Sequence, residues 1–307
     1  MKSIFGYLKQ HLREDFNALS YLLIALFLAV SILLNYQFDL YKQYIKSQHD
    51  MDRVISLALI YAVAYYLPLT VHCLATRNTA ALKSFRMWIL SALGIAILAV
   101  DTGAPWLDEW VNRLPAETRD LMYRSGNNLI SIFTVLLPLI VLYRFQPHHR
   151  SFYGLTLRGF DTRPYFAILL TLLPILAIAS FTDNLGAYYP MYKSTPAHLY
   201  WQLPEWVPVL IYEFAYGWDF LTVEMMYRGF FVIVLSTYLG RSSVIAMASL
   251  YCFLHFGKPE LEAISSIFGG YILGVIALET RSIYGGVIIH IGIAWMMELF
   301  GYLQKAY

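Results

Sequence analysis

The feature that most constrains this chain is a series of apolar runs, most of them long enough to cross a lipid bilayer. A membrane-spanning helix needs about 20 mostly apolar residues, and the sequence divides into about nine such runs. Their predicted ranges are 18–36, 54–75, 87–100, 129–143, 165–182, 207–239, 244–256, 263–277 and 283–303. The sequence therefore predicts an all-α fold, a polytopic transmembrane helical bundle with about 8–9 membrane helices.

The composition excludes several classes of protein. Of the 307 residues, 59% are hydrophobic and 14% are charged, whereas a soluble domain has about 45–50% apolar and about 25% charged residues. The formal net charge is only +2, and the sequence has no basic patch with interleaved aromatics, so no nucleic-acid partner is expected. Cys73 and Cys252 lie inside apolar runs without the spacing of a metal site. The expected partner is the lipid bilayer.

Charged residues outside the apolar runs predict an orientation. If the helices alternate in direction, most Lys and Arg residues fall on the side of the N-terminus, and most acidic residues fall in the opposite loops. Cytoplasmic loops are enriched in Lys and Arg, so we expect an integral membrane protein with a cytoplasmic N-terminus. The stretch 104–126 is too charged to span, and its Trp106 and Trp110 predict an interfacial helix or loop.

Ionisable residues concentrate in the last third of the chain. A charged side chain at the middle of a bilayer costs at least about 2.5–3.5 kcal/mol, so such residues pair or face a polar cavity. Within the run 207–239, Glu224 and Arg228 are four residues apart and are predicted to form an ion pair on one helix face. The pair can serve a catalytic site or only pin helices together. Glu213 and Asp219 lie in the same run.

Two histidines lie in separate predicted helices after this run. His255 ends the run 244–256, and His290 lies in the last run. Imidazole and carboxylate groups suit zinc-like metals, and they equally suit activation of water by a general base without a metal. His72 stands alone in the second run and is interpreted as structural, whereas His11, in a predicted loop, is given no role.

The order of these residues resembles a known family. The segment 224–229, EMMYRG, followed by His255 and His290, resembles the CPBP family of intramembrane proteases. The family's motifs are Glu-Glu-x-x-x-Arg, Phe-x-x-x-His and His-x-x-x-Asn, each on a separate membrane helix. The family includes CAAX prenyl endopeptidases of the Rce1 type and Abi-like bacteriocin-processing and self-immunity proteins. The resemblance implies a CPBP-like core in residues 165–307, preceded by membrane helices and interfacial loops in residues 1–164.

The sequence departs from the family motifs at three positions. Val223 stands where the family has its first Glu, Tyr251 replaces the Phe, and Ala294 replaces the Asn. Asp219 lies one helical turn before Val223, and Glu298 lies one turn after Ala294. A turn rises about 5.4 Å, which is close to the reach of a side chain. Our hypothesis is that Asp219 and Glu298 partly replace the missing groups.

The resemblance implies an intramembrane metallo-endopeptidase whose catalytic residues are Glu224, Arg228, His255 and His290. Water activated at this buried Glu/His site would hydrolyse a peptide bond in a membrane-associated peptide or protein. Glu224, His255 and His290 are the candidate ligands of Zn²⁺ or another divalent metal, and a mechanism without metal stays open. The resemblance also implies a location in a bacterial inner or plasma membrane.

Two other functions stay open. A catalytically inactive adaptor, chaperone or self-immunity protein of the same fold is favoured by the apolar residues Val223 and Ala294. A proton-coupled transporter would use the buried ionisable groups as a proton relay. Against the transporter, the two halves of the sequence show no inverted repeat of hydropathy.

Overall fold

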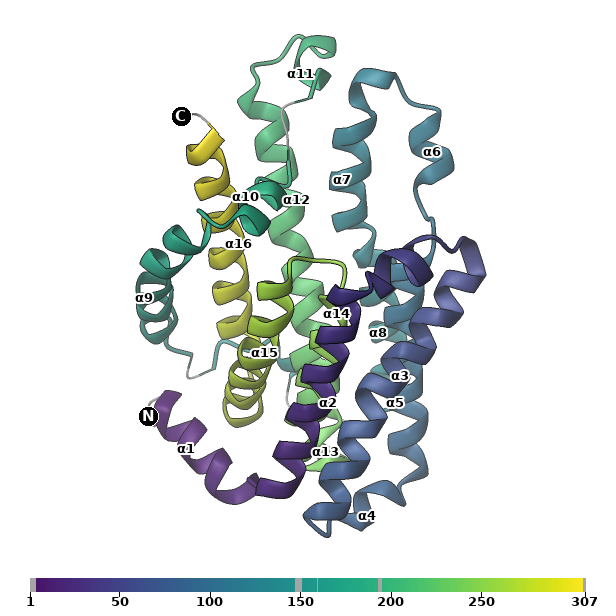
Figure 1. Ribbon diagram of the computed structural model, residues 1–307, viewed down its shortest axis with the longest axis vertical. Helices are drawn as coiled ribbons and strands as arrows, with labels where there is room; N and C mark the ends of the chain where they lie inside the picture. Colours follow the sequence, from purple (N-terminus) through teal and green to yellow (C-terminus); the bar gives the residue numbers. More distant parts are fainter. Residues whose placement is uncertain (1–3, 147–150, 159, 193–194, 306–307) are drawn as a thin grey trace. The chain divides into compact units, whose positions relative to one another are not determined.

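The chain is built from helices, with no strand, across the part that the computed structural model describes: residues 4–146, 151–158, 160–192 and 195–305 (Figure 1). Seven helices in this part are long and apolar enough to cross a membrane. They are Ala18–Gln37, Asp50–Ala75, Phe85–Asn112, Ala116–Leu142, Trp206–Leu239, Glu260–Thr280 and Tyr284–Gln304. Shorter apolar helices cover Arg163–Ala179 and Ser242–Leu254. Each predicted run therefore coincides with a helix, which confirms the predicted fold class.

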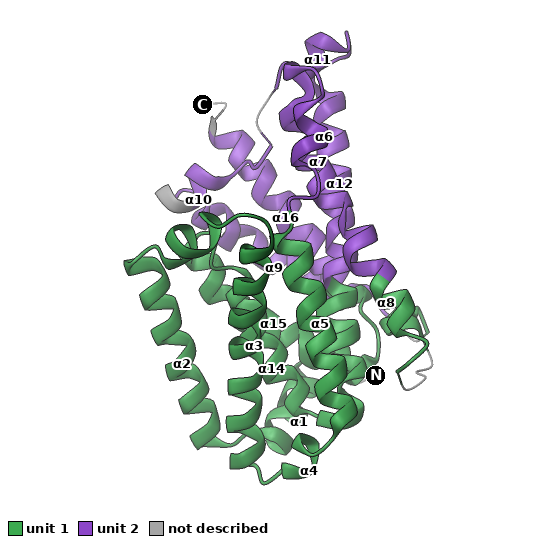
Figure 2. Ribbon diagram, turned by 90° about the vertical axis from the view of Figure 1, so that its right-hand side faces the viewer, with its two compact units in different colours: residues 1–104, 138–160, 224–286 green, residues 105–137, 161–223, 287–307 purple. Residues whose placement is uncertain are grey.

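Two compact units divide the chain (Figure 2). Unit 1 contains residues 1–104, 138–160 and 224–286, and unit 2 contains residues 105–137, 161–223 and 287–307. Each unit thus combines stretches that are far apart in the sequence. The predicted division at residue 164 follows the family motifs rather than contacts, and it stays a prediction.

Unit 1 is organised around α14 (Ser242–Leu254), which packs against both α3 (Asp50–Ala75) and α15 (Glu260–Thr280). Every residue of α14 except the last is buried, and a helix that is apolar on all sides belongs in a core. α3 also packs against α5 (Phe85–Gly103) and α2 (Ala18–Gln37). At about 20 Å long, α14 is shorter than the hydrocarbon core of about 30 Å, so longer neighbours must shield it.

The segment that carries Glu224 and Arg228 contains an unusual helix. α12 (Trp206–Glu224) is followed by η5 (Met225–Val234), a π-helix in which all ten residues are buried. The N–H of Leu235 donates to the carbonyl of Phe230, five residues back. π-Helices are rare and occur frequently at functional sites. The length of this run and its Gly217 and Gly229 predict a kinked helix, but hydropathy does not report hydrogen-bond register, so the sequence does not predict the π-helix.

A buried polar cluster fixes α1 (Ile4–Asp15) to the rest of unit 1. Nε2 of His11 lies 3.6 Å from Oδ2 of Asp15, and Nε2 of His72 lies 3.2 Å from the same oxygen. Arg241 donates to Nδ1 of His11 over 3.2 Å, so the proton of a neutral His11 lies on Nε2. The prediction that His11 lies in a loop is wrong, because it lies within α1 and is buried. His72 has the structural partners expected of it.

Burial lowers the pKa of His11 from 6.5 to about 4, Asp15 opposes this shift, and Arg241 adds to it. A detached α1 therefore takes up a proton below pH 6.5 that the docked helix does not bind. The attachment is strongest above pH 6.5 and weakens as the pH falls toward 4. We expect the free energy of unfolding to fall by at most about 3 kcal/mol over this range.

Thermal unfolding in detergent at pH 7.5 and pH 5 measures this effect. His11→Gln should flatten the pH dependence, because the uncharged amide takes up no proton. His49→Gln, at an exposed histidine that precedes α3, should keep the wild-type pH dependence. The account of α1 fails if wild type and His11→Gln respond equally to pH.

Unit 2 has a core rich in tyrosine. One of its clusters of buried residues consists of Leu121, Tyr192, Ala197, Tyr212, Tyr216 and Ala294. Tyr212 stacks on Tyr192 with ring centroids 5.3 Å apart and on Tyr216 with centroids 5.6 Å apart. Stacked aromatic pairs contribute stability beyond that expected from the surface area they bury. The core joins α7 (Arg119–Leu129), α12 and α16 (Tyr284–Lys305), together with the tyrosine-rich segment before α12.

The fourth apolar helix begins earlier than predicted. It covers Ala116–Leu142, so half of the stretch predicted as interfacial belongs to it. Asp120 and Arg124 lie one turn apart in α7, and Arg124 Nε is 2.9 Å from Asp120 Oδ2. Charge pairs at this spacing support a helix beyond its apolar part, which explains why the apolar pattern alone places the start too late.

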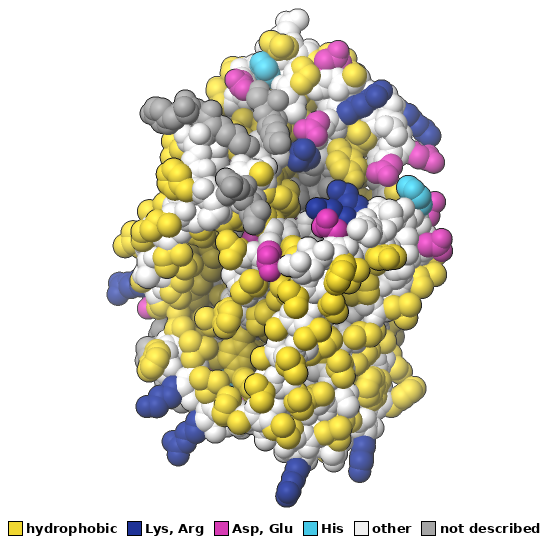
Figure 3. Space-filling model, viewed as in Figure 1, with side chains coloured by type: hydrophobic (Ala, Val, Ile, Leu, Met, Phe, Trp, Pro, Cys, Tyr) yellow, Lys and Arg dark blue, Asp and Glu magenta, His cyan; other side chains and the backbone are white. Residues whose placement is uncertain are grey.

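Apolar side chains form a wide band on the face of unit 1 shown in Figure 3. Exposed apolar residues of α2 and α15 in this unit include Leu22, Leu26, Leu33, Ile264 and Phe268. Lys and Arg side chains project at the end of unit 1 that holds α1 and α4 (Thr79–Leu82) (Figures 1 and 3). A continuous exposed apolar surface of this extent is typical of contact with lipid. Together with the seven long apolar helices it supports an integral membrane protein.

Candidate functional site

A buried ion pair lies at the junction of α12 and η5 in unit 1. Nη1 of Arg228 is 3.0 Å from Oε1 of Glu224, and both side chains are 0% exposed. The ion pair expected from the sequence is therefore present. Removing either charge would leave the other buried without compensation, which is strongly unfavourable.

Helix α14 brings an aromatic ring and an imidazole to this pair. The guanidinium of Arg228 lies over the ring of Tyr251, 4.5 Å from its centroid, in a cation–π contact. The ring of His255 meets the same tyrosine edge-on, with centroids 4.6 Å apart. Glu224, Arg228, Tyr251 and His255 thus form one continuous set of contacts, named here the Glu–His cluster.

The backbone sets the tautomer of His255. Its Nδ1 lies 2.8 Å from the carbonyl oxygen of Tyr251, and a carbonyl only accepts hydrogen bonds, so Nδ1 carries a hydrogen. Nε2 is then the ring nitrogen that can take up a proton or bind a metal. Helix α2 supports this segment, since the hydroxyl of Tyr36 donates to the carbonyls of His255 and Lys258 over 3.2 and 2.8 Å.

Gly286 provides the space for the carboxylate of Glu224. A Cβ atom built at Gly286 would collide with the carboxyl group of Glu224. Glu224 is fully buried and held by Arg228, so it has little room to move away. A residue other than glycine at position 286 would therefore displace the ion pair.

We expect Gly286→Ala to lower the free energy of unfolding by about 1–3 kcal/mol through overpacking. Gly269→Ala in α15 is the matched control, because a Cβ there meets nothing within 4 Å and alanine favours the helix by about 1 kcal/mol. Chemical or thermal unfolding of both variants in detergent measures the difference. Equal stability of the two variants would show that Glu224 does not lie against Gly286.

His290 and Asp219 lie in unit 2. The ring of His290 stacks on Phe220 with centroids 5.5 Å apart and an interplanar angle of 19°. The hydroxyl of Thr222 lies 2.8 Å from the carbonyl oxygen of Asp219 and 2.9 Å from the hydroxyl of Ser131. A common site for His290, in unit 2, and the Glu–His cluster, in unit 1, stays a prediction, as does the replacing role of Asp219.

Glu298 has partners of its own in unit 2. The side chain is 2% exposed, and its Oε1 accepts the N–H of Met191 over 2.8 Å. Its carboxyl group also meets that of Glu213, whose carbonyl accepts from the indole of Trp295. These contacts account for the burial of Glu298, and its role as a replacement for the missing Asn stays a prediction.

A metal centre needs more ligands than either unit supplies by itself. Structural and catalytic zinc sites use three or four protein ligands. Among the described residues, no three His, Cys, Asp or Glu side chains are grouped so that they could hold a metal ion. In unit 1 the suitable groups are Glu224, already paired with Arg228, and His255. The Glu–His cluster alone therefore does not fit a zinc ion.

The family comparison covers this region of the chain. Residues 205–296 match the family model described as Type II CAAX prenyl endopeptidase Rce1-like. This segment is named here the Rce1-like domain, after the family model that it matches. The match confirms the resemblance seen in the sequence and supports an intramembrane protease kind of function. Comparisons with curated proteins and with solved structures found no match.

The Rce1-like domain contains the whole Glu–His cluster, and it also contains His290 and Asp219 but ends before Glu298. Two features of its site are missed by sequence reasoning. The ring of Tyr251 joins Arg228 to His255, a tertiary contact that no spacing rule predicts. Gly286 could have been noticed in the sequence, because a glycine inside an apolar helix costs stability and often marks a point where another group approaches the backbone closely.

Proposed function

We propose that the chain is an intramembrane endopeptidase of the CAAX-protease type. The observation that carries this proposal is the buried Glu–His cluster inside the Rce1-like domain. Buried charges cost stability unless they are well paired, so a fully buried ion pair beside an imidazole calls for a role. The cluster links a carboxylate, a guanidinium and, through the ring of Tyr251, an imidazole, and these are groups that peptide hydrolysis uses.

Each member of the cluster has a role in the proposed hydrolysis. His255 accepts a proton from water through Nε2 while its Nδ1–H stays on the carbonyl of Tyr251. The hydroxide attacks the peptide carbonyl carbon, and the N–H groups of Arg228 stabilise the oxyanion that develops. The C–N bond then breaks, and the imidazolium returns the proton to the leaving amine. Glu224 holds Arg228 in place.

A divalent metal is part of the proposal as a second way to activate the same water. Glu224, His255 and His290 would hold Zn²⁺ or a similar ion, which lowers the pKa of a bound water to about 7. Metal analysis of the purified protein tests this. One metal ion per chain that is lost in His255→Ala supports it, and equal metal content in both proteins contradicts it.

The experiment for the activity uses a farnesylated peptide that ends in a CAAX sequence, incubated with the protein in proteoliposomes. Mass spectrometry should detect a shortened peptide with wild type. The same peptide without the farnesyl group reports whether the lipid is needed. An unchanged farnesylated peptide after long incubation, with folded protein, would contradict the proposal for this substrate class.

An inactive relative that acts as an adaptor, chaperone or self-immunity protein is the second candidate. One observation favours it: Ala294, which stands in place of the family's Asn, is 5% exposed and packs in the tyrosine core of unit 2. That position thus serves packing rather than polar contact. Failure of the farnesylated peptide to react, together with stable binding to other membrane proteins, would support this candidate.

We also propose that the protein resides in a bacterial inner or plasma membrane with its N-terminus in the cytoplasm. The Lys and Arg side chains at the α1 and α4 end of unit 1 support this orientation. Exposed residues in this group include Lys9, Arg13, Arg77, Lys83 and Arg86.

A further inference from the structure

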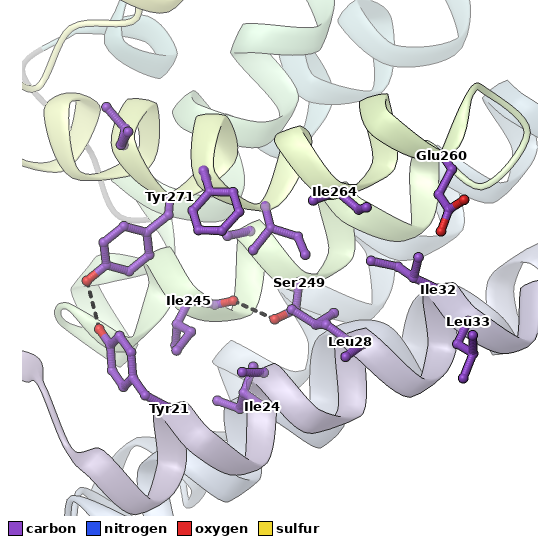
Figure 4. Close-up of a pocket in the computed structure, with 16 residues that line it drawn as sticks. Tyr21, Ile24, Leu28, Ile32, Leu33, Ile245, Ser249, Glu260, Ile264 and Tyr271 are labelled. Carbon is purple, nitrogen blue, oxygen red and sulfur yellow. Dashed lines mark hydrogen bonds between the residues drawn. The ribbon is translucent and has the colours of Figure 1, made fainter. Parts of the chain in front are cut away.

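A groove of about 760 Å³ lies between α2, α14 and α15 in unit 1 (Figure 4). Ile24, Leu28 and Ile32 form the α2 side, and each is almost fully buried. Ile264 and Phe268 belong to the α15 side and are exposed. Because α2 and α15 are both long and apolar enough to cross a membrane, the groove faces lipid rather than water.

Most polar groups of the groove lie toward its two ends. At one end the hydroxyls of Tyr21 and Tyr271 are 2.7 Å apart, and toward the other end lies the exposed carboxylate of Glu260 (Figure 4). Between them, the one polar side chain among the described lining residues is Ser249. Its hydroxyl already donates to the carbonyl of Ile245 over 2.9 Å. The middle of the groove therefore offers nothing to a polar ligand.

The length of the groove matches one lipid chain. Along α2 the lining extends from Tyr21 to Leu33, which is about 18 Å at the helical rise. One leaflet contributes about 15 Å to the hydrocarbon core of a bilayer. A site with apolar walls does not retain water, so an acyl chain is the ligand that fits both its length and its lining.

We propose that the groove is a binding site for one acyl chain of a phospholipid whose headgroup carries an amine, with the amine at Glu260. The carboxylate of Glu260 attracts a cationic headgroup and repels an anionic one. The described lining residues include no Lys, Arg or His, so a free fatty acid would find no counter-charge there. This site is separate from the Glu–His cluster and does not depend on the proposed peptidase activity.

A photoreactive lipid tests the proposal on the whole protein in nanodiscs. The probe is phosphatidylethanolamine with a diazirine midway along one acyl chain, and cross-linked residues are located by mass spectrometry. We expect labelling to concentrate on groove residues of α2 and α15. It should be several-fold higher there than at Leu22 and Leu26, which lie on α2 outside the groove. Uniform labelling of all lipid-facing helices would overturn the site.

Two double variants of α2 provide a matched comparison. Ala25→Trp with Ala29→Trp fills the groove, since both alanines line it and are exposed. Leu22→Trp with Leu26→Trp places the same bulk on exposed positions outside the lining. Labelling of the α15 side should fall several-fold in the first variant and persist in the second. Equal labelling in both variants would overturn the proposal.

The preference for an amine headgroup is measured in the wild-type protein, so this experiment does not depend on the folding of a variant. Phosphatidylglycerol with the same photoreactive chain should label the groove several-fold less than phosphatidylethanolamine. Glu260→Gln should reduce that difference while leaving the groove itself intact. Equal labelling by the two lipids in wild type would overturn the assignment of the amine to Glu260.

Discussion

Replacement of Arg228 by methionine is expected to lower the free energy of unfolding by about 3–5 kcal/mol, because it leaves a buried carboxylate without its partner. Glu224 is 0% exposed, and Arg228 also makes the cation–π contact with Tyr251. Methionine has a similar shape, so the loss reports the charge rather than a cavity. Denaturant unfolding in detergent measures the effect.

A double variant separates the charge from the packing. Glu224→Gln combined with Arg228→Met removes both charges, and we expect its stability to return close to that of wild type. Arg113→Met is the control, since Arg113 and Glu109 form an exposed pair at 3.5 Å and exposed pairs contribute little. If Arg228→Met were as stable as wild type, the conclusion that Glu224 and Arg228 form a buried ion pair would be wrong.

Replacement of His255 by asparagine is expected to lower kcat for cleavage of the farnesylated peptide by about 10²–10⁴-fold, the usual contribution of a general base. The amide of asparagine occupies the place of Nδ1, so it can still donate to the carbonyl of Tyr251. The variant thus keeps the local hydrogen bond and lacks the nitrogen that takes up the proton. Its unfolding midpoint should stay close to that of wild type.

His198→Asn is the matched control for this prediction. Its Nδ1 makes the same type of hydrogen bond, to the carbonyl of Thr195 over 2.9 Å, but it lies in unit 2 outside the Rce1-like domain. We expect full activity from His198→Asn. Full activity from His255→Asn would instead remove His255 from the reaction.

The fold could be predicted from the sequence because length and apolarity are local properties. Each of the nine predicted runs is a helix, and the pair Glu224–Arg228 forms as its spacing predicts. The early start of the helix Ala116–Leu142 is missed because charge pairs, rather than apolar residues, sustain its first turns. The π-helix η5 is missed because hydrogen-bond register leaves no mark on hydropathy.

The remaining parts of the site depend on contacts between distant segments. Tyr251 in α14 contacts Arg228 in η5. Gly286 leaves space for the carboxylate of Glu224, more than sixty residues earlier in the chain. His11 has a polar sequence context, yet it is buried beside Asp15, which also contacts His72, and its Nδ1 lies against Arg241. Such partners are set by tertiary packing, which a single sequence does not encode in its spacing.

The double variant Glu224→Gln with Arg228→Met also provides the most direct test of the central claim, that the Glu–His cluster carries out hydrolysis. Its rate of cleavage of the farnesylated CAAX peptide should be compared with that of wild type in the same proteoliposomes. The account predicts a stable protein that leaves the peptide intact while wild type shortens it. Cleavage by the double variant at the wild-type rate would contradict the account, since the ion pair would then serve only to hold the helices together.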